Sequence, residues 1–391
     1  MTRQRLHIVF LEDLQSQSVR EVFMGAAGYA AERPHWDFDP WPVSAEESPV
    51  PSPEDLDAVD GILTSELAIS QVHGIQRLRW IPRVYFLADY HHPNASCVSL
   101  DERGIGRLAA EHLLSRGYRH CVFIGCSSKG WSKQRGEGFA LALASARALF
   151  ESHEFPEETL PVFWSWNMTR HLREVLKLLG SISKPCGIFA ANDVIAYFVI
   201  QASRQLRLRI PEDIGVVGVD DDPVPNAATR LTISSIHPPF REVGRRAAEL
   251  LDTLCDSQFL PSVRIQVSAA RVAVRASTDG FMTDDALVRK AQSYIESHRH
   301  ERVSVCEVTR AVGSNRVTLG KHFQRELDVG LLEYIRKRRI EHCREKLQMG
   351  EMNVEEVARS FGFSSSSYFS RVFKKVTGLS PGRLSRGMRV S

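Results

Sequence analysis

The C-terminal part of the chain carries one sequence pattern twice, and this repeat limits the possible folds more than any other feature. Each copy has an amphipathic segment, a glycine and a second amphipathic segment, with the two glycines at positions 313 and 362. The apolar residues are spaced as on a helix with one buried face. The sequence therefore predicts an all-α domain with two helix-turn-helix units, joined by a basic helix that includes RKRRIEHCREK. The residues that set the pattern are Val305, Val308, Val312, Leu319 and Phe323 in the first copy, and Val354, Val357, Ala358, Phe361, Phe369, Val372, Phe373 and Val376 in the second.

The residues before this repeat alternate short apolar runs with helical patterns. Strands at this spacing predict parallel α/β sheets, and runs without polar alternation, such as IGVVGV, fit strands that are buried on both faces. Because about 275 residues exceed one typical open sheet, we expect two α/β lobes. The stretch 37–57 is rich in Pro, Glu and Ser and predicts a loop. The clearest predicted strands are 6–11, 61–63, 83–87, 121–124, 187–190 and 214–219, and the clearest helices are 19–31, 107–115, 139–150 and 194–206.

Charge is divided unequally between these two parts of the chain. The 391 residues have a formal net charge of only +3, but Thr283–Ser391 holds 21 Lys and Arg against 13 Asp and Glu. The C-terminal part is therefore basic and the part before it acidic, which favours a polyanionic partner for the former. The charge balance changes sign near the segment TDGFMTDD, and we place the boundary between residues 1–278 and 279–391 there.

Several classes of protein are disfavoured by what the sequence lacks. The seven cysteines show neither a CxxC pair nor metal-ligand spacing, which favours reduced, buried thiols of a cytoplasmic protein. The first apolar run is too short for a signal peptide, and no stretch approaches the roughly 18 apolar residues of a membrane span. The sequence contains no P-loop, GxSxG motif or dinucleotide-binding glycine pattern. We therefore expect a cytoplasmic protein that is not an enzyme and that needs no cofactor and no metal.

The second helix of each predicted unit presents polar and basic side chains opposite its apolar face. Arginine and lysine donate to guanine in the major groove, and serine serves bases or phosphates. Arg336, Lys337 and Arg338 on the joining helix are expected at phosphates. The pattern indicates binding of double-stranded DNA, although the same charges also suit the solvated surface of a helical bundle. The predicted DNA-contacting residues are Val317, Thr318 and Lys321 in the first unit, and Ser366, Ser367, Ser370, Arg371 and Lys374 in the second.

Residues 286–385 resemble the AraC/XylS-type DNA-binding domain, which has seven helices and two helix-turn-helix units. The resemblance rests on VSVCEVTRAVGSNRVTLGKHF, YIRKRRIEHCREKL and, above all, VEEVARSFGFSSSSYFSRVFKKVTGLSP. By position, it implies base contacts through Val317 and Lys321 in the first unit, and through Ser367 and Arg371 in the second. Gly320 stands where the family usually has a side chain, which leaves base contacts by the first unit open.

Residues 5–280 resemble the effector-binding core of the LacI/GalR repressors, a periplasmic-binding-protein-like pair of α/β lobes. The segments that carry the resemblance include SLDERGIGRLAAEHLLSRGYRHCVFIG, AANDVIAYFVIQASRQLRLRIPEDIGVVGVDDD and LTISSIHPPFREVGRRAAELL. The resemblance implies a small sugar effector between the lobes, with D-xylose or another pentose as the leading candidate. We also expect a homodimer, with RNA polymerase as a further partner.

Polar residues that follow predicted strands are the candidates for the sugar site. In open α/β sheets the ligand lies beyond the carboxyl ends of the strands. A carboxylate there accepts sugar hydroxyls, an arginine donates to them, and an indole stacks on the apolar face of the sugar. The candidates by family position are Arg135, Asn192 and Asp220.

Three further residues belong to the same predicted site. Asp193 either contacts the ligand or caps the helix that follows it. Asp13 comes after the first strand and is a candidate from the other lobe. Trp131 either stacks on the sugar or packs in the crevice between the lobes without touching it.

These expectations combine into a sequence-specific DNA-binding transcription regulator that a small sugar controls. Two alternatives remain at this point. One is a soluble sugar-binding protein or sugar-acting enzyme with a basic helical tail for another partner. The other is an architectural DNA-binding protein that responds to no ligand. The sequence does not distinguish activation from repression.

Overall fold

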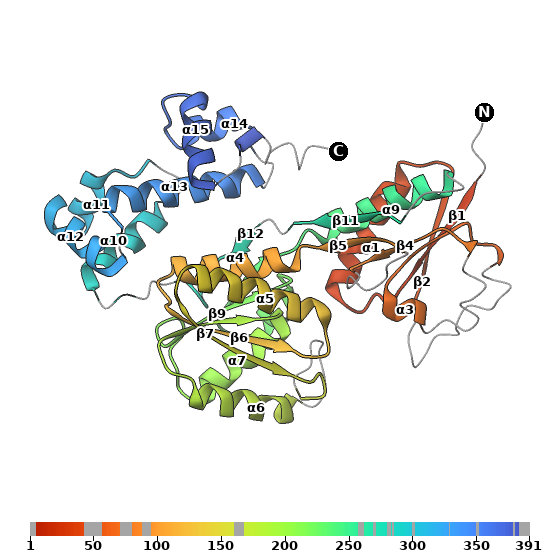
Figure 1. Cartoon of the computed structure of the whole chain (residues 1–391), viewed down its shortest axis with the longest axis horizontal. Coiled ribbons are helices and arrows are strands. Elements are labelled where there is room, and N and C mark those ends of the chain that lie inside the picture. The colour runs from red at the N-terminus through yellow and green to blue at the C-terminus, as the bar shows by residue number, and fades with distance from the viewer. Residues whose placement is uncertain are drawn as a thin grey trace.

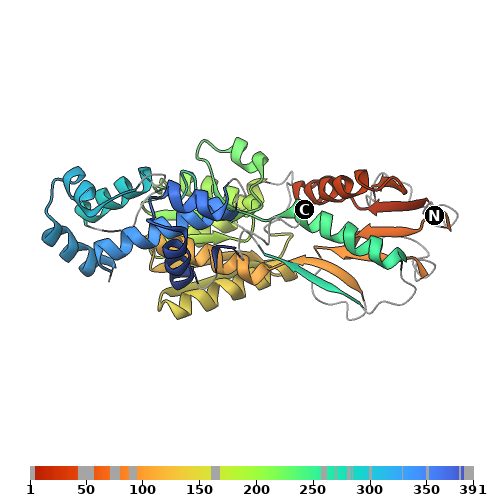
Figure 2. The same ribbon diagram turned by 90° about the horizontal axis from the view of Figure 1, so that it is seen from above.

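Two six-stranded β-sheets with flanking helices precede a group of helices in the computed structural model of the chain (Figure 1). Lobe 1 is the sheet that contains the N-terminal strand, together with the helices packed on it. Lobe 2 is the other sheet with its helices, and the helices that follow both sheets form the helical domain. Figures 1 and 2 show the helical domain next to lobe 2. The structure describes residues 5–42, 57–70, 80–87, 95–159, 168–256, 262–268, 271–279, 283, 285–298, 302–327, 329–348, 352–377 and 380–382.

Strands and helices largely alternate along the two lobes, as predicted, and further strands that the sequence pattern did not indicate complete the sheets. The strands are β1 (Leu6–Leu11), β2 (Trp36–Trp41), β3 (Gly61–Thr64), β4 (Arg83–Phe86), β5 (Ser96–Leu100), β6 (His120–Cys126), β7 (Leu149–Phe155), β8 (Cys186–Ala190), β9 (Ile214–Val219), β10 (Ser234–His237), β11 (Arg264–Val267) and β12 (Arg271–Ala273). The helices are α1 (Gln17–Ala31), α3 (Glu66–Ser70), α4 (Glu102–Ser115), α5 (Gly130–Ser145), α6 (Met168–Ser181), α7 (Asp193–Gln205), α8 (Pro223–Ala228), α9 (Phe240–Asp256), α10 (Ala286–Ser297), α11 (Val305–Ala311), α12 (Arg316–Leu327), α13 (Leu331–Gln348), α14 (Val354–Ser360) and α15 (Ser366–Thr377).

Each lobe is an open sheet that is almost wholly parallel. Lobe 1 has the strand order β11-β5-β4-β3-β1-β2, and lobe 2 has β12-β10-β9-β8-β6-β7, with β12 antiparallel to β10. Figure 1 shows α4 and α5 on one face of the lobe 2 sheet, with α6 and α7 on the other. All residues of β8 and β9 are buried, because helices cover both faces of these central strands.

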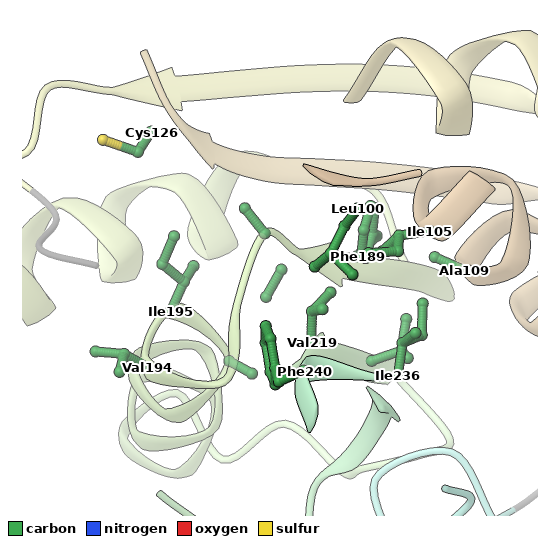
Figure 3. Close-up of a cluster of buried hydrophobic side chains, with 14 of the residues drawn as sticks. Leu100, Ile105, Ala109, Cys126, Phe189, Val194, Ile195, Val219, Ile236 and Phe240 are labelled. Atoms are coloured by element: carbon green, nitrogen blue, oxygen red, sulfur yellow. The ribbon is translucent and has the colours of Figure 1, made fainter. Parts of the chain in front are cut away.

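The two lobes share three chain crossings. The chain passes between them after β5, after β10 and after β11. Figure 3 shows the core beside the first crossing, where Leu100 and Ile105 lie near Phe189, Val219 and Ile236. α4 therefore begins at the junction of the lobes and packs on lobe 2.

The helical domain is built around α13, which belongs to two small hydrophobic cores. Its first half packs with α10, α11 and α12, and its second half packs with α14 and α15. The turns after α11 and α14 contain Gly313 and Gly362 with φ of 68° and 65°, a conformation that favours glycine. Capping boxes begin α11 and α14, so the predicted repeat is confirmed as two helix-turn-helix units. The α13 residues in the first core are Leu331, Tyr334 and Ile335, and those in the second are Ile340, Cys343 and Leu347.

The predicted fold class is confirmed, but two of the predicted elements are wrong. The predicted loop over 37–57 contains most of β2, which pairs with β1, while residues 43–56 lie outside the described residues. The predicted helix 139–150 is instead the end of α5, which starts earlier at Gly130, followed by β7. A seventh helix, which the AraC resemblance implies, begins at residues 381–382, and the residues after it lie outside the described part of the chain. Residues 280–282 and 284, at the predicted domain boundary, also lie outside the described residues.

Candidate ligand site and DNA interface

The side chain of Arg135 is the centre of a buried polar cluster at the carboxyl end of the lobe 2 sheet. Arg135 lies on the second turn of α5, and its Nε donates to Glu102 Oε2 at 2.6 Å. Its Nη1 donates to the carbonyl oxygen of Ala191, just after β8, at 2.6 Å. The same nitrogen lies 3.9 Å from Asp220 Oδ1, just after β9. Four segments that are distant in sequence therefore meet around one guanidinium group.

Trp131 covers this guanidinium group. The Cζ atom of Arg135 lies 4.6 Å from the centroid of the Trp131 ring, which is a cation–π contact. Trp131 lies one turn before Arg135 on α5 and is partly buried against the core of the lobe. The indole thus lies at the predicted site, where its partner is the arginine side chain.

Asp220 has a backbone conformation that few residues adopt. Its φ is 103° and that of Asp221 is 55°, so the chain turns sharply as β9 ends. Asp221 holds the turn through an ion pair with Arg275 at 2.5 Å and a second contact to His237 at 3.5 Å. The turn leaves the Asp220 side chain a quarter exposed and directed at Arg135. Strain at a strand end beside a charged cluster is a common feature of binding sites.

The carboxyl group of Asp220 is also unusual in its ionisation. Burial raises its pKa to about 7, and the effect of Arg135, which lowers it, is opposed by the nearby carboxylates of Glu102 and Asp222. Glu102 and Asp220 thus compete for the one guanidinium group. A neutral polyol that offers hydroxyl groups to both carboxylates would relieve this competition.

The helix cap that the sequence suggests for Asp193 is provided by its neighbour Asn192. The Asn192 side chain caps α7 by accepting a hydrogen bond from the backbone N–H of Ile195 at 3.0 Å, so the cap predicted for Asp193 is wrong. Asp193 is 1% exposed, and its carboxylate accepts hydrogen bonds from Ser235 Oγ and from the backbone N–H of Asp222. Asp193 therefore supports the loop that carries Asp220, and burial raises its pKa.

Lobe 1 provides acidic groups at the end of β1. Asp13 is partly buried and accepts a hydrogen bond from the N–H of Gln15 at 3.1 Å, which stabilises its own turn. Glu12 is only 8% exposed, and its Oε2 has no hydrogen-bond partner among the described residues. Burial raises the pKa of Glu12. The sequence argument missed Glu12, although the strand-end rule that selected Asp13 applies to its neighbour equally.

The two recognition helices present their predicted residues to solvent. Leu319 and Phe323 of α12 are fully buried, while Val317 is 68% exposed. Asn315 caps α12 through a hydrogen bond from the N–H of Thr318 at 2.8 Å. A Cβ atom at Gly320 would meet no other atom within 4 Å, so nothing inside the fold requires glycine there. The other predicted contact residues are exposed except Ser370, which is partly buried: Thr318, Lys321, Ser366, Ser367, Ser370, Arg371 and Lys374.

The prediction that Arg338 contacts phosphate is wrong. Arg336 and Lys337 are exposed, but Arg338 is 9% exposed and faces the interior of the protein. Its Nη2 lies 2.7 Å from Glu296 Oε2. The three basic residues are consecutive on a helix, so they cannot all point in the same direction.

The two α/β lobes and the exposed helices of the helix-turn-helix units define the class of protein. It is a DNA-binding transcription regulator with a domain of the kind that binds small molecules. A family model described as a periplasmic binding protein-like domain matches residues 110–278, and a model described as a helix-turn-helix domain matches residues 308–387. The chain therefore carries a periplasmic-binding-protein-like domain followed by an AraC-type helix-turn-helix domain.

Particular proteins are similar to this chain over most of its length. The chain is 29% identical over 300 residues to the xylose operon regulatory protein of Escherichia coli strain K12, which covers 76% of this chain and 75% of that protein. It is 27% identical over 303 residues to the protein of the same name from Haemophilus influenzae, with 76% of each covered. A solved structure of the xylose-binding transcription activator xylR matches with a TM-score of 0.61 and 25% identity over 99% of both chains.

No described helix is long and apolar enough to cross a membrane. Within the same part of the chain, no group of three His, Cys, Asp or Glu side chains is arranged to hold a metal ion.

Proposed function

We propose that the chain regulates transcription in response to a small sugar, and that the sugar is a pentose, with D-xylose as the first candidate. The observation that carries this proposal is the cluster of Arg135, Glu102 and Asp220 beneath Trp131, in one chain with two helix-turn-helix units. Carboxylates, a guanidinium group and an indole are the groups that recognise a neutral polyol. The names of the relatives, which refer to xylose, support the choice of sugar.

Each side chain has a distinct part in the proposed binding. Asp220 accepts hydrogen bonds from ligand hydroxyls, and Arg135 donates to ligand oxygens. Asn192 offers its amide beside them, and Asp193 holds the loop of Asp220 in place. Trp131 covers the apolar face of the ring. Asp13 and Glu12 close the site from lobe 1.

The proposed response uses closure of the two lobes. A ligand that touches both lobes favours the closed arrangement only by its higher affinity for that arrangement. Closure changes the contact within a homodimer and so the positions of the DNA-binding helices. In each protomer α12 and α15 enter successive major grooves, about 34 Å apart on straight DNA. The regulator acts in the cytoplasm, where DNA and RNA polymerase, its further partner, are present.

A gel-shift titration with the promoter DNA upstream of the gene tests the proposal. The full-length chain is titrated with and without D-xylose, and D-ribose, L-arabinose and D-glucose serve as controls. We expect a specific shift whose midpoint changes at least fivefold with D-xylose and less with the other sugars. Absence of a specific shift would exclude the regulator, and an identical response to every sugar would exclude a selective sensor.

Two single variants separate the sugar site from the DNA interface. Asp220→Ala should abolish the sugar effect and keep DNA binding, because its side chain lies in lobe 2. Arg371→Ala should weaken DNA binding by about 1–3 kcal/mol and keep sugar binding in a thermal-shift titration. Arg359→Ala is the matched control, because Arg359 is exposed and pairs with Glu355 on α14. Normal sugar binding by Asp220→Ala would show that the site is misplaced.

A further inference from the structure

Helix α4 connects the proposed sugar site with the helical domain. Its first residue is Glu102, which binds Arg135 in the site at 2.6 Å. Its C-terminal cap is Arg116, which contacts the helical domain. Fourteen residues of α-helix span about 21 Å. One rigid element therefore has the proposed ligand-binding cluster at one end and the other domain at the far end. Figure 1 shows α4 extending from the junction of the lobes toward the helical domain.

Helices α4 and α5 are in contact through their backbones. A Cβ atom at Gly106 on α4 would lie 2.0 Å from the carbonyl oxygen of Arg135, and one at Gly138 on α5 would lie 2.1 Å from that of Arg103. Glycine is thus required at both positions for the two helices to approach so closely. An ion pair between Arg103 and Glu137, at 2.7 Å, adds to the contact. Because the helices are locked together, a shift of Arg135 moves α4 with it.

The far end of α4 enters a buried ionic cluster that includes residues of both domains. Arg116 Nη2 lies 3.8 Å from Glu296 Oε1 at the end of α10, and the Arg116 side chain is 1% exposed. The same carboxylate lies 2.7 Å from Arg338 and 3.6 Å from His342, both on α13. One glutamate of the helical domain therefore faces an arginine from each domain.

The last described residues of lobe 2 also lie beside this end of α4. His112, one turn before Arg116, contacts Thr278 Oγ1 at 2.7 Å, and Thr278 donates to Ser234 Oγ on β10 at 2.6 Å. Burial, with Arg116 and Arg338 nearby, lowers the pKa of His112 well below its usual value. The last residues of lobe 2, the end of α4 and the helical domain thus meet at one place.

The ionised carboxylate of Glu296 is stabilised by the positive charges around it, so small movements of these charges affect it. Burial alone would raise the pKa of Glu296, but His342, Arg338 and Arg116 hold it well below its usual range. A buried charge that loses its partner is strongly destabilised. A displacement of Arg116 therefore changes the balance of charge around Glu296, and α10 and α13 must adjust.

We propose that the contact between Arg116 and Glu296 transmits occupancy of the sugar site to the helical domain through α4. The inference rests on the proposed function, since it requires a ligand that competes with Glu102 for Arg135. When Arg135 turns to the ligand, α5 and α4 shift together and the end of α4 moves relative to Glu296. The position of the DNA-binding helices then depends on whether the site is occupied.

The test measures coupling, which is the ratio of the DNA dissociation constants of the full-length protein without and with D-xylose. We expect Glu296→Gln and Arg116→Gln each to bring this ratio to within twofold of one, from at least fivefold in the wild type. D-xylose binding, followed by calorimetry, should remain within about tenfold of wild type. Glu111→Gln is the control, because Glu111 forms an exposed ion pair with Arg107 elsewhere on α4 and should keep wild-type coupling.

A second measurement on the unmodified protein covers the case in which both variants fail to fold. Hydrogen–deuterium exchange of residues 112–116 and 290–297 should change on addition of D-xylose. Wild-type coupling in folded Glu296→Gln, or unchanged exchange in both segments while the sugar site is protected, would overturn the transmission route and leave the proposed function intact. A wild type in which D-xylose alters neither DNA binding nor exchange would overturn the proposed function itself.

Discussion

Asp220 has a left-handed backbone conformation and a carboxyl group with a pKa near neutral pH. Its pKa is about 7, whereas an aspartate in an unfolded chain has a pKa near 3.9. Between these values the folded state binds more protons than the unfolded state. The stability that this group contributes is therefore present below about pH 4 and is lost as the pH rises through 7. Asp220 thus reduces stability at neutral pH, as binding residues commonly do.

Because the pKa of Asp220 is raised, removal of its charge should stabilise the folded protein at high pH. Asp220→Asn should raise the free energy of unfolding by about 1–3 kcal/mol at pH 8 and change it little at pH 4, because asparagine carries no charge to bury. Urea unfolding of both proteins at the two pH values measures the difference. Asp221→Asn is the control of opposite sign: although burial works against it, His237 and Arg275 lower the pKa of Asp221. Equal effects of Asp220→Asn at both pH values would show that the pKa of Asp220 is not raised in the folded protein.

The residues of the candidate site differ in how far sequence could predict them. Asp220 and Asn192 follow apolar strands directly, and a parallel sheet brings the ends of its strands together. Glu102 follows the strand that crosses between the lobes, and only the packing of α4 on α5 brings it to Arg135. Arg338 looks like its two basic neighbours in the sequence, and only burial against Glu296 separates it from them.

Helix α12 has glycine in its interior, where most helices have a residue with a side chain. Gly320→Ala should raise the free energy of unfolding by about 0.5–1 kcal/mol, because glycine is costly within a helix and a Cβ atom has open space here. Chemical unfolding of the full-length protein measures this. Since the fold accepts the methyl group, a change in DNA affinity would show that α12 lies close to DNA.

Gly180→Ala in α6 is the matched control for this substitution, because a Cβ atom there also meets no atom within 4 Å. It should stabilise the protein similarly and leave DNA affinity unchanged. Destabilisation by Gly320→Ala would mean that the methyl group clashes with neighbouring atoms at this position of α12.

Two causes explain the strands that the sequence missed. β5 (SCVSL) and β10 (SSIH) lie inside the sheets, but serine residues interrupt their apolar runs. Other missed strands lie at sheet edges. β8 and β9 lie inside the sheet of lobe 2, are buried on both faces and appear in the sequence as apolar runs. β2 and β7 lie at sheet edges and have the sequences WDFDPW and LFESHEF, which are largely exposed. An edge strand has one neighbour and more solvent, so its sequence lacks the apolar run that marks an interior strand.

Considered as a whole, the molecule separates a ligand-binding part from a DNA-binding part, and among the described residues the two parts meet at a buried cluster that contains Arg116 and Glu296. The overall order of domains could be predicted, because each part has its own periodicity and charge. The cluster of Arg116, Glu296 and Arg338 could not, because ionic pairing between distant segments leaves no periodic pattern in either segment. The proposed coupling between the parts is thus a property of the folded chain that the sequence of neither part indicates.

The sharing of α13 between two hydrophobic cores has a consequence for the operator DNA. An 18-residue helix is about 27 Å long and cannot stretch, so the two recognition helices of one protomer keep a constant separation. The base pairs that they contact must then keep one spacing. Inserting 5 base pairs between these two sets should abolish specific binding, and inserting 10 should not restore it, although the helical phase is then correct. A flexible joint would tolerate the longer insertion, and a gel shift with the three DNA duplexes distinguishes the two. Promoters recognised by this protein should therefore tolerate changes of base far better than changes of length.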